Sequence, residues 1–476
     1  MSKLECPTEL TFRPFFMEVF MENYYLITEK EGKLLLKFSI PCILSLLISA
    51  LYNIVDQIFI GNSSVGAIGN TATTIIFPLT VIALAFALML GDGGAAYMSL
   101  CMGKGDGKKI NKLVGSLITV SILISVIFLL IGFPFLDNIA SFFGAKTEES
   151  LIYAHEYGFI ILIGIPFYII MNMLNSIIRA DGSPKVAMIS MVIGAIINII
   201  LDALFILGLD LGLTGAALAT IIGQIVSFII SVIYLFRAKN FKLEITSFKP
   251  DLKLLLEGIK MGASSFLTQI SIVIITVVSM NMLAKYGASS KYGINDPQAI
   301  IGVVMKLFTI VVNISVGISA GAQPIIGYNY GAGKNKRVKK LFFIIIGLNI
   351  ILGLIATILF ETIPAPILSI FGTNSLNPEL YKEFGIMTMR IYLLLINFTI
   401  IQKSVSIFLQ AMGSPIEAAI LSLARDVVGM VIFTVVLPMF WGIEGILWSA
   451  PFTDVIGIIL AIIFSIKMLK NLIIKM

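Results

Sequence analysis

The chain has 476 residues, of which 58% are hydrophobic and only 13% are charged. A soluble domain of average composition carries about 25% charged residues, so these proportions exclude an ordinary soluble protein. The formal net charge of +6 does not indicate nucleic-acid binding, because the basic residues lie in short segments between apolar runs. In such segments they more often record membrane orientation.

Residues 1–36 contain no apolar core of signal-peptide length followed by a cleavage site, so we expect an uncleaved tail. The rest of the chain is dominated by apolar runs long enough to cross a bilayer as helices. We therefore predict an all-α polytopic membrane protein with twelve transmembrane helices. The predicted spans are 37–60, 68–97, 112–133, 153–178, 185–208, 212–236, 257–285, 298–325, 339–360, 386–411, 416–438 and 443–467.

Lys and Arg are distributed unevenly between the two sides of this predicted bundle. The two tails and every second loop hold 25 of the 33 basic residues, and the opposite loops hold five. The positive-inside rule then places both termini in the cytoplasm and favours an even number of spans. We expect a multi-pass protein of the bacterial cytoplasmic membrane.

Three sequence motifs occur twice, in the same order and at nearly constant offsets of 231, 230 and 228 residues. They are ADGSP at 180–184 with AMGSP at 411–415, LGLTGA at 211–216 with WGIEGI at 441–446, and MGKGDGKKINKL at 102–113 with YGAGKNKRVKKL at 330–341. This repetition predicts two halves of six spans each. Parallel repeats are typical of transporters, which place a site between the halves and rock one half against the other.

The repeat defines the predicted domain organisation. After the cytoplasmic tail of residues 1–36, an N-lobe covers 37–240, a cytoplasmic connector covers 241–256, and a C-lobe with a short cytoplasmic tail covers 257–476.

Several polar residues lie inside apolar spans of the first half. Asp56 lies about one helical turn below the outer end of the first span. Asn198 and Asp202 share one face of the fifth span because they are four residues apart. Thr220 in the sixth span and Tyr157 in the fourth lie at comparable depth. A carboxylate at the centre of a membrane helix costs roughly 2.5–3.5 kcal/mol on insertion scales, so we expect these residues to face a cavity.

Two carboxylates close together repel each other, and such a pair favours uptake of a proton or a cation. Carboxylate, amide and hydroxyl oxygens suit a hard cation such as Na⁺ equally well, so the sequence leaves H⁺ and Na⁺ open. A structural role, in which buried hydrogen bonds only hold the helices together, is the alternative interpretation.

The motifs of this chain resemble those of the multidrug and toxic compound extrusion (MATE) family, over nearly its whole length and most closely in the MepA-like bacterial group. The most specific motif is GAQPIIGYNYGAG at 321–333. The others are IP at 40–41, LYNIVDQIFIG at 51–61, RADGSP at 179–184, NIILD at 198–202 and AMGSP at 411–415.

The resemblance implies two six-helix lobes around a central cleft, and export of bulky, mostly cationic and aromatic drugs in exchange for H⁺ or Na⁺. It implies that Asp56, Asn198, Asp202 and Thr220 carry the coupling cation or proton. The candidate residues lining the cavity are Tyr52, Asn53, Tyr157, Asn172, Asn175, Gln269 and Lys403. The expected partners are small-molecule drugs and membrane lipid, with no nucleic acid, and the chain is expected to act as a monomer.

The second half departs from the family pattern. Some relatives carry acidic coupling residues on helices seven and ten, where this chain has Gln269 and NFTIIQKS at 397–404 without a carboxylate. We therefore expect the coupling to rest on the first half alone. Arg425 and Asp426 are adjacent, so on an α-helix they point about 100° apart and need not pair. Lys306 is expected to extend toward the membrane surface.

Other classes of function remain as alternatives. A flippase for lipid-linked saccharides or peptidoglycan precursors would favour a basic cleft, which Lys306, Lys403 and Arg425 could supply. A scaffold or a channel is the second alternative. Three cysteines without a CxxC pattern and a single histidine give no basis for a metal cluster or a histidine-based active site. We expect no enzyme activity and no cofactor. GDGG at 91–94 lacks the Lys-Ser/Thr of a phosphate loop and predicts close helix packing or a flexible inner end of the second span.

Overall fold

The computed structural model describes residues 24–474 except 62, 64, 146, 294 and 370–376. Most of the predicted N-terminal tail therefore lies outside the described residues. In the described part all regular structure is helical, and eleven helices are long and apolar enough to cross a membrane. A twelfth span forms when the bent pair α14 and α15 counts as one, so the prediction of an all-α protein with twelve spans is confirmed.

The first six spans form a group that we call the N-lobe. Its span-forming helices are α3 (Glu31–Gly61), α4 (Gly66–Gly103), α5 (Gly107–Gly132), α7 (Glu148–Ala180), α8 (Pro184–Asp202) with its π-helical continuation η1 (Ala203–Gly208), and α9 (Gly212–Leu235). The short helices α2 (Tyr25–Thr28) and α6 (Leu136–Phe143) precede α3 and α7.

The last six spans form the C-lobe, which follows the short 3₁₀-helix η2 (Ile245–Phe248). Its helices are α10 (Leu252–Ala288), α11 (Asn295–Gly331), α12 (Asn335–Thr362), α13 (Pro364–Ser369), α14 (Pro378–Tyr392), α15 (Ile396–Ala411), α16 (Pro415–Ser422), the π-helix η3 (Leu423–Gly429), α17 (Met430–Val436), α18 (Pro438–Trp441) and α19 (Ile443–Ile474). The predicted tenth span, 386–411, is bent by 45° between α14 and α15 and begins eight residues earlier.

The two lobes repeat the same turns. Gly182 and Gly413 have φ angles of 79° and 76°, and each precedes a Ser-Pro pair that begins the next helix. Glycine adopts this left-handed conformation without steric cost, and proline fits the first helical position because that residue's N–H has no helical partner. The other two motif pairs also carry equivalent left-handed glycines, namely Gly105 with Gly333 and Gly212 with Gly442. The motifs that occur twice in the sequence therefore adopt the same backbone conformation in both lobes.

Asp181, in the turn between α7 and α8, ties together segments that are distant in sequence. Its side chain is buried and accepts hydrogen bonds from the Tyr234 hydroxyl at 2.6 Å and from the backbone N–H groups of Lys239 and Asn240 at 2.8 and 2.9 Å. Burial raises the pKa of the Asp181 carboxyl, and these hydrogen bonds oppose that shift. The carboxylate thereby fixes the chain that leaves α9 for the connector.

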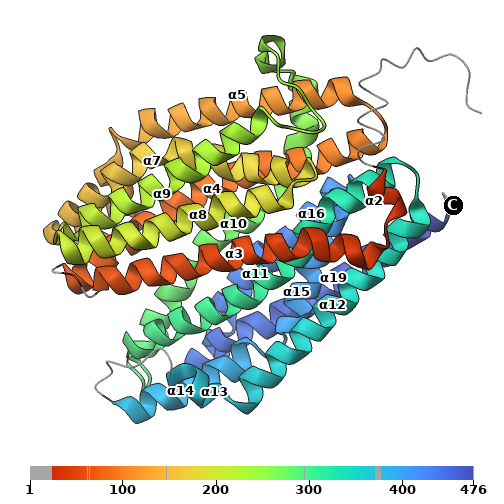
Figure 1. Cartoon of the computed structure of the whole chain (residues 1–476). Helices are drawn as coiled ribbons and strands as arrows, with labels where there is room; N and C mark the ends of the chain where they lie inside the picture. The colour runs from red at the N-terminus through yellow and green to blue at the C-terminus, as the bar shows by residue number, and fades with distance from the viewer. Residues whose placement is uncertain are drawn as a thin grey trace, which may run out of the picture.

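The lobes meet on the side of the bundle where α2 and the C-terminus lie, at the right of Figure 1, which we call the tail side. There α4 packs against α10, and α11 packs against α3. A side chain at Gly93 of α4 would place its Cβ 2.1 Å from the Gly258 carbonyl oxygen, and one at Gly321 of α11 would place it 2.6 Å from the Ser39 Cα. GDGG thus serves close helix packing, as predicted.

We expect Asp181→Ala to destabilise the fold, because it removes the acceptor of the buried Tyr234 hydroxyl and of the backbone N–H groups of Lys239 and Asn240. The expected loss is about 3 kcal/mol, measured as a lower midpoint of thermal unfolding in detergent. Glu149→Ala, which removes an exposed carboxylate of the same lobe, is the control and should unfold like the parent. Equal unfolding midpoints for the two variants would contradict the role of Asp181.

Candidate functional site

The polar residues predicted to form a site lie on three helices of the N-lobe that pack together. Asp56 is on α3, Asn198 and Asp202 are on α8, and Thr220 is on α9. Helix α3 contacts α8, α9 and η1. Asp56, Asn198 and Asp202 are all buried, and the charges of the two aspartates are close enough to act on each other.

Small residues bring α8 and α9 close to one another. A Cβ at Gly223 of α9 would lie 2.7 Å from the Gly194 carbonyl oxygen and 3.1 Å from the Asn198 Cβ. This approach lets the Asn198 Nδ2 reach the Thr220 hydroxyl oxygen at 3.5 Å. Directly after Asp202 the helix widens into the π-helix η1, a distortion that occurs frequently at functional sites.

Four buried oxygens of this cluster have no hydrogen-bond partner. They are the Asp56 Oδ1, the Asn198 Oδ1 and both Oδ atoms of Asp202. Buried polar atoms in native proteins are nearly always hydrogen-bonded, so unpartnered ones require an explanation. We name this group of Asp56, Asn198, Asp202 and Thr220 the N-lobe oxygen cluster.

The chemistry of the N-lobe oxygen cluster is that of oxygen alone. Carboxylate, amide and hydroxyl oxygens are the donors that hard cations prefer, and a carboxylate can equally take up a proton. In the described residues no group of three or more His, Cys, Asp or Glu side chains is placed to hold a metal ion. The cluster therefore offers the oxygen atoms that a proton or a hard cation such as Na⁺ would bind.

Residues predicted to line a cavity surround this cluster in part. The phenol groups of Tyr52 and Tyr157 lie within electrostatic range of Asp56 and Asp202. Asn53, on the exposed surface of α3, donates to the Ser49 carbonyl oxygen.

Two further predicted residues lie on α7, at a different place. Asn172 donates to the Tyr168 carbonyl oxygen. Asn175 is buried and accepts from the Ser190 hydroxyl at 2.9 Å, so its amide joins α7 to α8. Gln269, the predicted residue of the C-lobe, is partly buried on α10.

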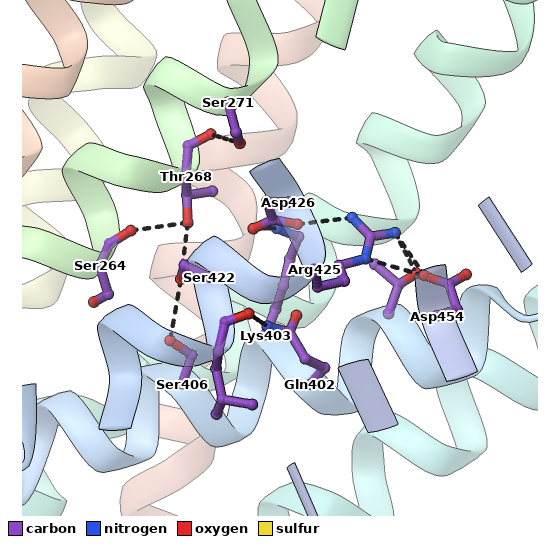
Figure 2. Close-up of polar contacts among 12 residues, drawn as sticks. Ser264, Thr268, Ser271, Gln402, Lys403, Ser406, Ser422, Arg425, Asp426 and Asp454 are labelled. Atoms are coloured by element: carbon purple, nitrogen blue, oxygen red, sulfur yellow. Dashed lines mark hydrogen bonds and ion pairs between the residues drawn. The ribbon is translucent and has the colours of Figure 1, made fainter. Parts of the chain in front are cut away.

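A second group of buried ionisable residues lies in the C-lobe (Figure 2). Lys403 of α15 donates from Nζ to the Asp426 Oδ2 at 3.0 Å. Arg425 donates to the Asp426 Oδ1 at 2.8 Å and to the Asp454 Oδ1 of α19 at 2.7 Å. The Thr399 hydroxyl also donates to the Asp454 Oδ1, at 2.7 Å. We call Lys403, Arg425, Asp426 and Asp454 the C-lobe charge network; it contains two cations and two carboxylates.

The sequence prediction differs from the structure in this network. Arg425 and Asp426 pair with each other, although neighbours on a helix point in different directions. They lie in the π-helix η3, and the long arginine side chain reaches both Asp426 and Asp454. Asp454 was missed as a partner because it comes from the last span. Only the three-dimensional packing of α19 against α15 and η3 brings it to Arg425.

The fold, the N-lobe oxygen cluster and the C-lobe charge network together indicate the class of protein. A membrane protein of twelve helices in two parallel repeats, with carboxylates buried inside its spans, has the architecture of a secondary transporter. The chain belongs to the MatE family: the MatE family model matches residues 41–204 and 264–435. These two matches fall one in each lobe.

Curated relatives cover nearly the whole chain. The multidrug export protein MepA of Staphylococcus haemolyticus (strain JCSC1435) is 28% identical over 458 residues, which is 94% of this chain and 96% of that protein. MepA of Staphylococcus aureus (strain MRSA252) is 29% identical over 439 residues, covering 90% and 91%. The family of multidrug export transporters and the membrane-spanning architecture follow from these matches.

Solved structures share the fold. A structure described as MATE in complex with MaL6 matches with a TM-score of 0.86 at 22% identity, over 95% of this chain and 99% of that chain. One described as the outward-facing conformation of a multidrug resistance MATE family transporter of the MOP superfamily also gives 0.86 at 22% identity, over 95% and 98%.

The C-lobe charge network predicts an unequal response to single and double substitutions. Arg425→Met leaves the Asp454 carboxylate buried without its cation, and breaking a buried pair in this way costs roughly 3–5 kcal/mol. We expect the double variant Arg425→Met with Asp454→Leu to recover part of that loss in thermal unfolding. A double variant that is less stable than the single variant would contradict charge compensation as the main role of Arg425.

Proposed function

We propose that this chain is an antiporter that exports drugs across the bacterial cytoplasmic membrane in exchange for H⁺ or Na⁺. Two lobes, residues 37–240 and 257–476, rock against each other around the connector at 241–256. The exported molecules are small, mostly cationic and aromatic. The protein needs no cofactor and works as a monomer in the lipid bilayer.

One observation carries this proposal: the unpartnered oxygens of the N-lobe oxygen cluster. A purely structural cluster would satisfy its own hydrogen bonds, as the buried Asp181 carboxylate does in the turn between α7 and α8. Desolvated carboxylates without a cation or a proton are costly inside a membrane. Loading of Asp56 and Asp202 with a coupling ion removes that cost.

The proposed mechanism follows from the difference in free energy between the N-lobe oxygen cluster with a bound ion and the same cluster without one. Asp56 and Asp202 take up H⁺ or Na⁺ when the cluster faces the outside. Neutralisation lets α3 repack against α8 and α9, and the drug leaves. An ion can shift the two conformations only by as much as its affinity differs between them, so the cluster must hold the ion more weakly when it faces the cytoplasm.

The membrane orientation rests on the distribution of basic residues. Loops and tails on the tail side carry most of the Lys and Arg of the sequence, which favours a cytoplasmic tail side. Because the lobes contact each other on that side, the conformation with α4 against α10 and α11 against α3 is then the one open to the outside. The similar solved structure described as outward-facing supports this assignment.

The C-lobe charge network bears on the flippase alternative. A flippase would need basic side chains that are available to an anionic headgroup. Lys403 and Arg425 are instead paired with Asp426 and Asp454, with side-chain exposures of 12% and 7%. Drug export is therefore the better-supported function, and Lys403 contributes a neutralised pair rather than a free cation.

We expect proteoliposomes containing the parent protein to transport ethidium when a pH gradient or a Na⁺ gradient is imposed. Asp56→Asn and Asp202→Asn each remove one ionisable group and should lower gradient-driven transport at least tenfold. Ethidium fluorescence in the liposome lumen is the measurement. The gradient that drives transport identifies the coupling ion.

The matched control is Asp137→Asn, which neutralises an exposed carboxylate of the same lobe and should transport like the parent. Undiminished coupled transport by Asp56→Asn would assign that residue a structural role and place the coupling elsewhere.

A separate experiment tests the substrate class. The reconstituted parent protein should move ethidium but no fluorescently labelled lipid-linked saccharide. The expected reason is that Lys403 and Arg425 are already paired with Asp426 and Asp454. Transport of the labelled lipid without transport of ethidium would replace drug export with the flippase function.

A further inference from the structure

Asp92 on α4 is a membrane-embedded carboxylate that the proposed coupling does not use. It lies in the tail-side half of α4, directly before Gly93, where α4 and α10 pack closely together. Its Oδ1 accepts from the Ser176 hydroxyl at 2.8 Å and from Arg179 at 3.4 Å. Both partners are on α7, so within the N-lobe Asp92 is held by an ion pair.

The other oxygen of Asp92 points across the boundary between the lobes. Ser265 of α10 in the C-lobe donates from its hydroxyl to the Asp92 Oδ2 at 3.1 Å. Gln323 of α11, also in the C-lobe, donates from Nε2 to the backbone carbonyl oxygen of Asp92 at 3.4 Å. One residue of the N-lobe thus receives hydrogen bonds from two helices of the C-lobe.

Two residues at equivalent positions of the repeat, Arg179 and Gln410, bind the two partners of the Asp92–Ser265 hydrogen bond. Arg179 directly precedes the ADGSP motif, as Gln410 directly precedes AMGSP, and the two residues are 231 positions apart. Arg179 binds Asp92, and Gln410 donates from Nε2 to the Ser265 hydroxyl at 3.4 Å and to the Met261 carbonyl oxygen at 2.8 Å. The result is a chain Arg179–Asp92–Ser265–Gln410 that crosses from one lobe to the other.

We propose that Asp92 and Ser265 form a latch that keeps the lobes closed on the tail side. In the ion-exchange cycle proposed above, on which this assignment rests, the lobes must part on this side before a drug can enter from the cytoplasm. The Asp92–Ser265 and Gln323–Asp92 hydrogen bonds then break, whereas the Asp92–Arg179 pair stays intact within the N-lobe. The latch therefore contributes only to the closed state and sets how often the tail side opens.

Three features favour the Asp92–Ser265 hydrogen bond over hydrogen bonds between other polar groups at the boundary. Hydrogen bonds to a charged acceptor are stronger than those between neutral groups. The acceptor is preorganised, because Ser176 and Arg179 hold the carboxylate in place on the N-lobe side. The close packing at Gly93 leaves little room for water to replace Ser265 when the lobes begin to separate.

A native cysteine can report on the opening. Cys42 is 2% exposed and lies close enough to Asp92 and Arg179 for their charges to act on its thiol. Its neighbours Ser39 and Ile43 on α3 contact α11 across the same boundary. Buried thiols are inert, so N-ethylmaleimide should label Cys42 only when the lobes part on the tail side. Replacing Cys6 and Cys101 by serine leaves this single reporter.

The decisive variant is Ser265→Ala, because it removes the latch donor and leaves the Asp92–Arg179 pair untouched. We expect Cys42 in this variant to be labelled about tenfold faster than in the single-cysteine parent, from the loss of one hydrogen bond to a charged group. Asp92→Asn should act in the same direction. Ser265→Thr keeps the hydroxyl and should return the labelling rate toward that of the parent.

The matched control is Ser264→Ala, one residue earlier on the same helix, where the Ser264 carbonyl oxygen bonds to Thr268 inside the C-lobe. Labelling of this control at the parent rate shows that loss of a serine from α10 is not enough to open the boundary. If Ser265→Ala and Asp92→Asn label no faster than the parent, or if Ser264→Ala labels as fast as Ser265→Ala, the latch is wrong.

The labelling rate needs no transported drug, so the outcome is independent of the ethidium experiment. Faster labelling of Ser265→Ala in a protein that transports no ethidium would keep the latch and overturn drug export. Active ethidium transport by the parent protein, together with an unchanged labelling rate in Ser265→Ala, would keep drug export and overturn the latch.

Discussion

The cost of placing a charge in the hydrocarbon core governs the polar interior of this protein. The two lobes meet that cost in opposite ways. In the C-lobe, Lys403 and Arg425 compensate Asp426 and Asp454 through direct hydrogen bonds. In the N-lobe, Asp56 and Asp202 lie on neighbouring helices with buried oxygens that no side chain satisfies. A compensated network is stable in one state, whereas an uncompensated one is stable only when something else is bound.

Duplication of the six-helix unit explains why the two lobes share a backbone conformation, but it does not explain why their buried ionisable side chains differ. The repeated motifs give both lobes the same left-handed glycine turns, and two equivalent helix pairs form the boundary, α4 against α10 and α11 against α3. The side chains have diverged on that common frame. Arg179 forms an ion pair with Asp92, while the equivalent Gln410 bonds to neutral groups of α10. The proposed function assigns ion binding to the N-lobe, whereas the C-lobe charge network balances two cations with two carboxylates.

The sequence predicts much of this architecture because the membrane imposes strong, local rules. Apolar runs indicate the spans, the spacing of Asn198 and Asp202 places them on one helix face, and the MGSP and DGSP motifs reveal the repeat. What it does not predict depends on packing between distant helices. No periodic signal marks the pairing of Arg425 with Asp454, the π-helix after Asp202, the π-helix that contains Asp426, or the contact of Asp92 with Ser265. Such contacts are decided by which helix faces meet, and a single sequence does not encode that choice in a readable pattern.

The separation of the two kinds of carboxylate has a mechanistic consequence. A transporter needs one group whose interaction with the bound ion changes during the cycle, and another whose interaction changes with the lobe contact. Asp56 and Asp202 lie within the N-lobe and do not contact the C-lobe through the hydrogen bonds described above. Asp92 lies at the boundary and is held within the N-lobe by Arg179. Movement of α3 can carry the effect of ion binding to the boundary, because α3 packs against α8 and also against α11. The kink-prone Pro41 of α3 lies between Ser39 and Ile43, at the contact with α11, so this helix is positioned to transmit the change from the oxygen cluster to the lobe contact.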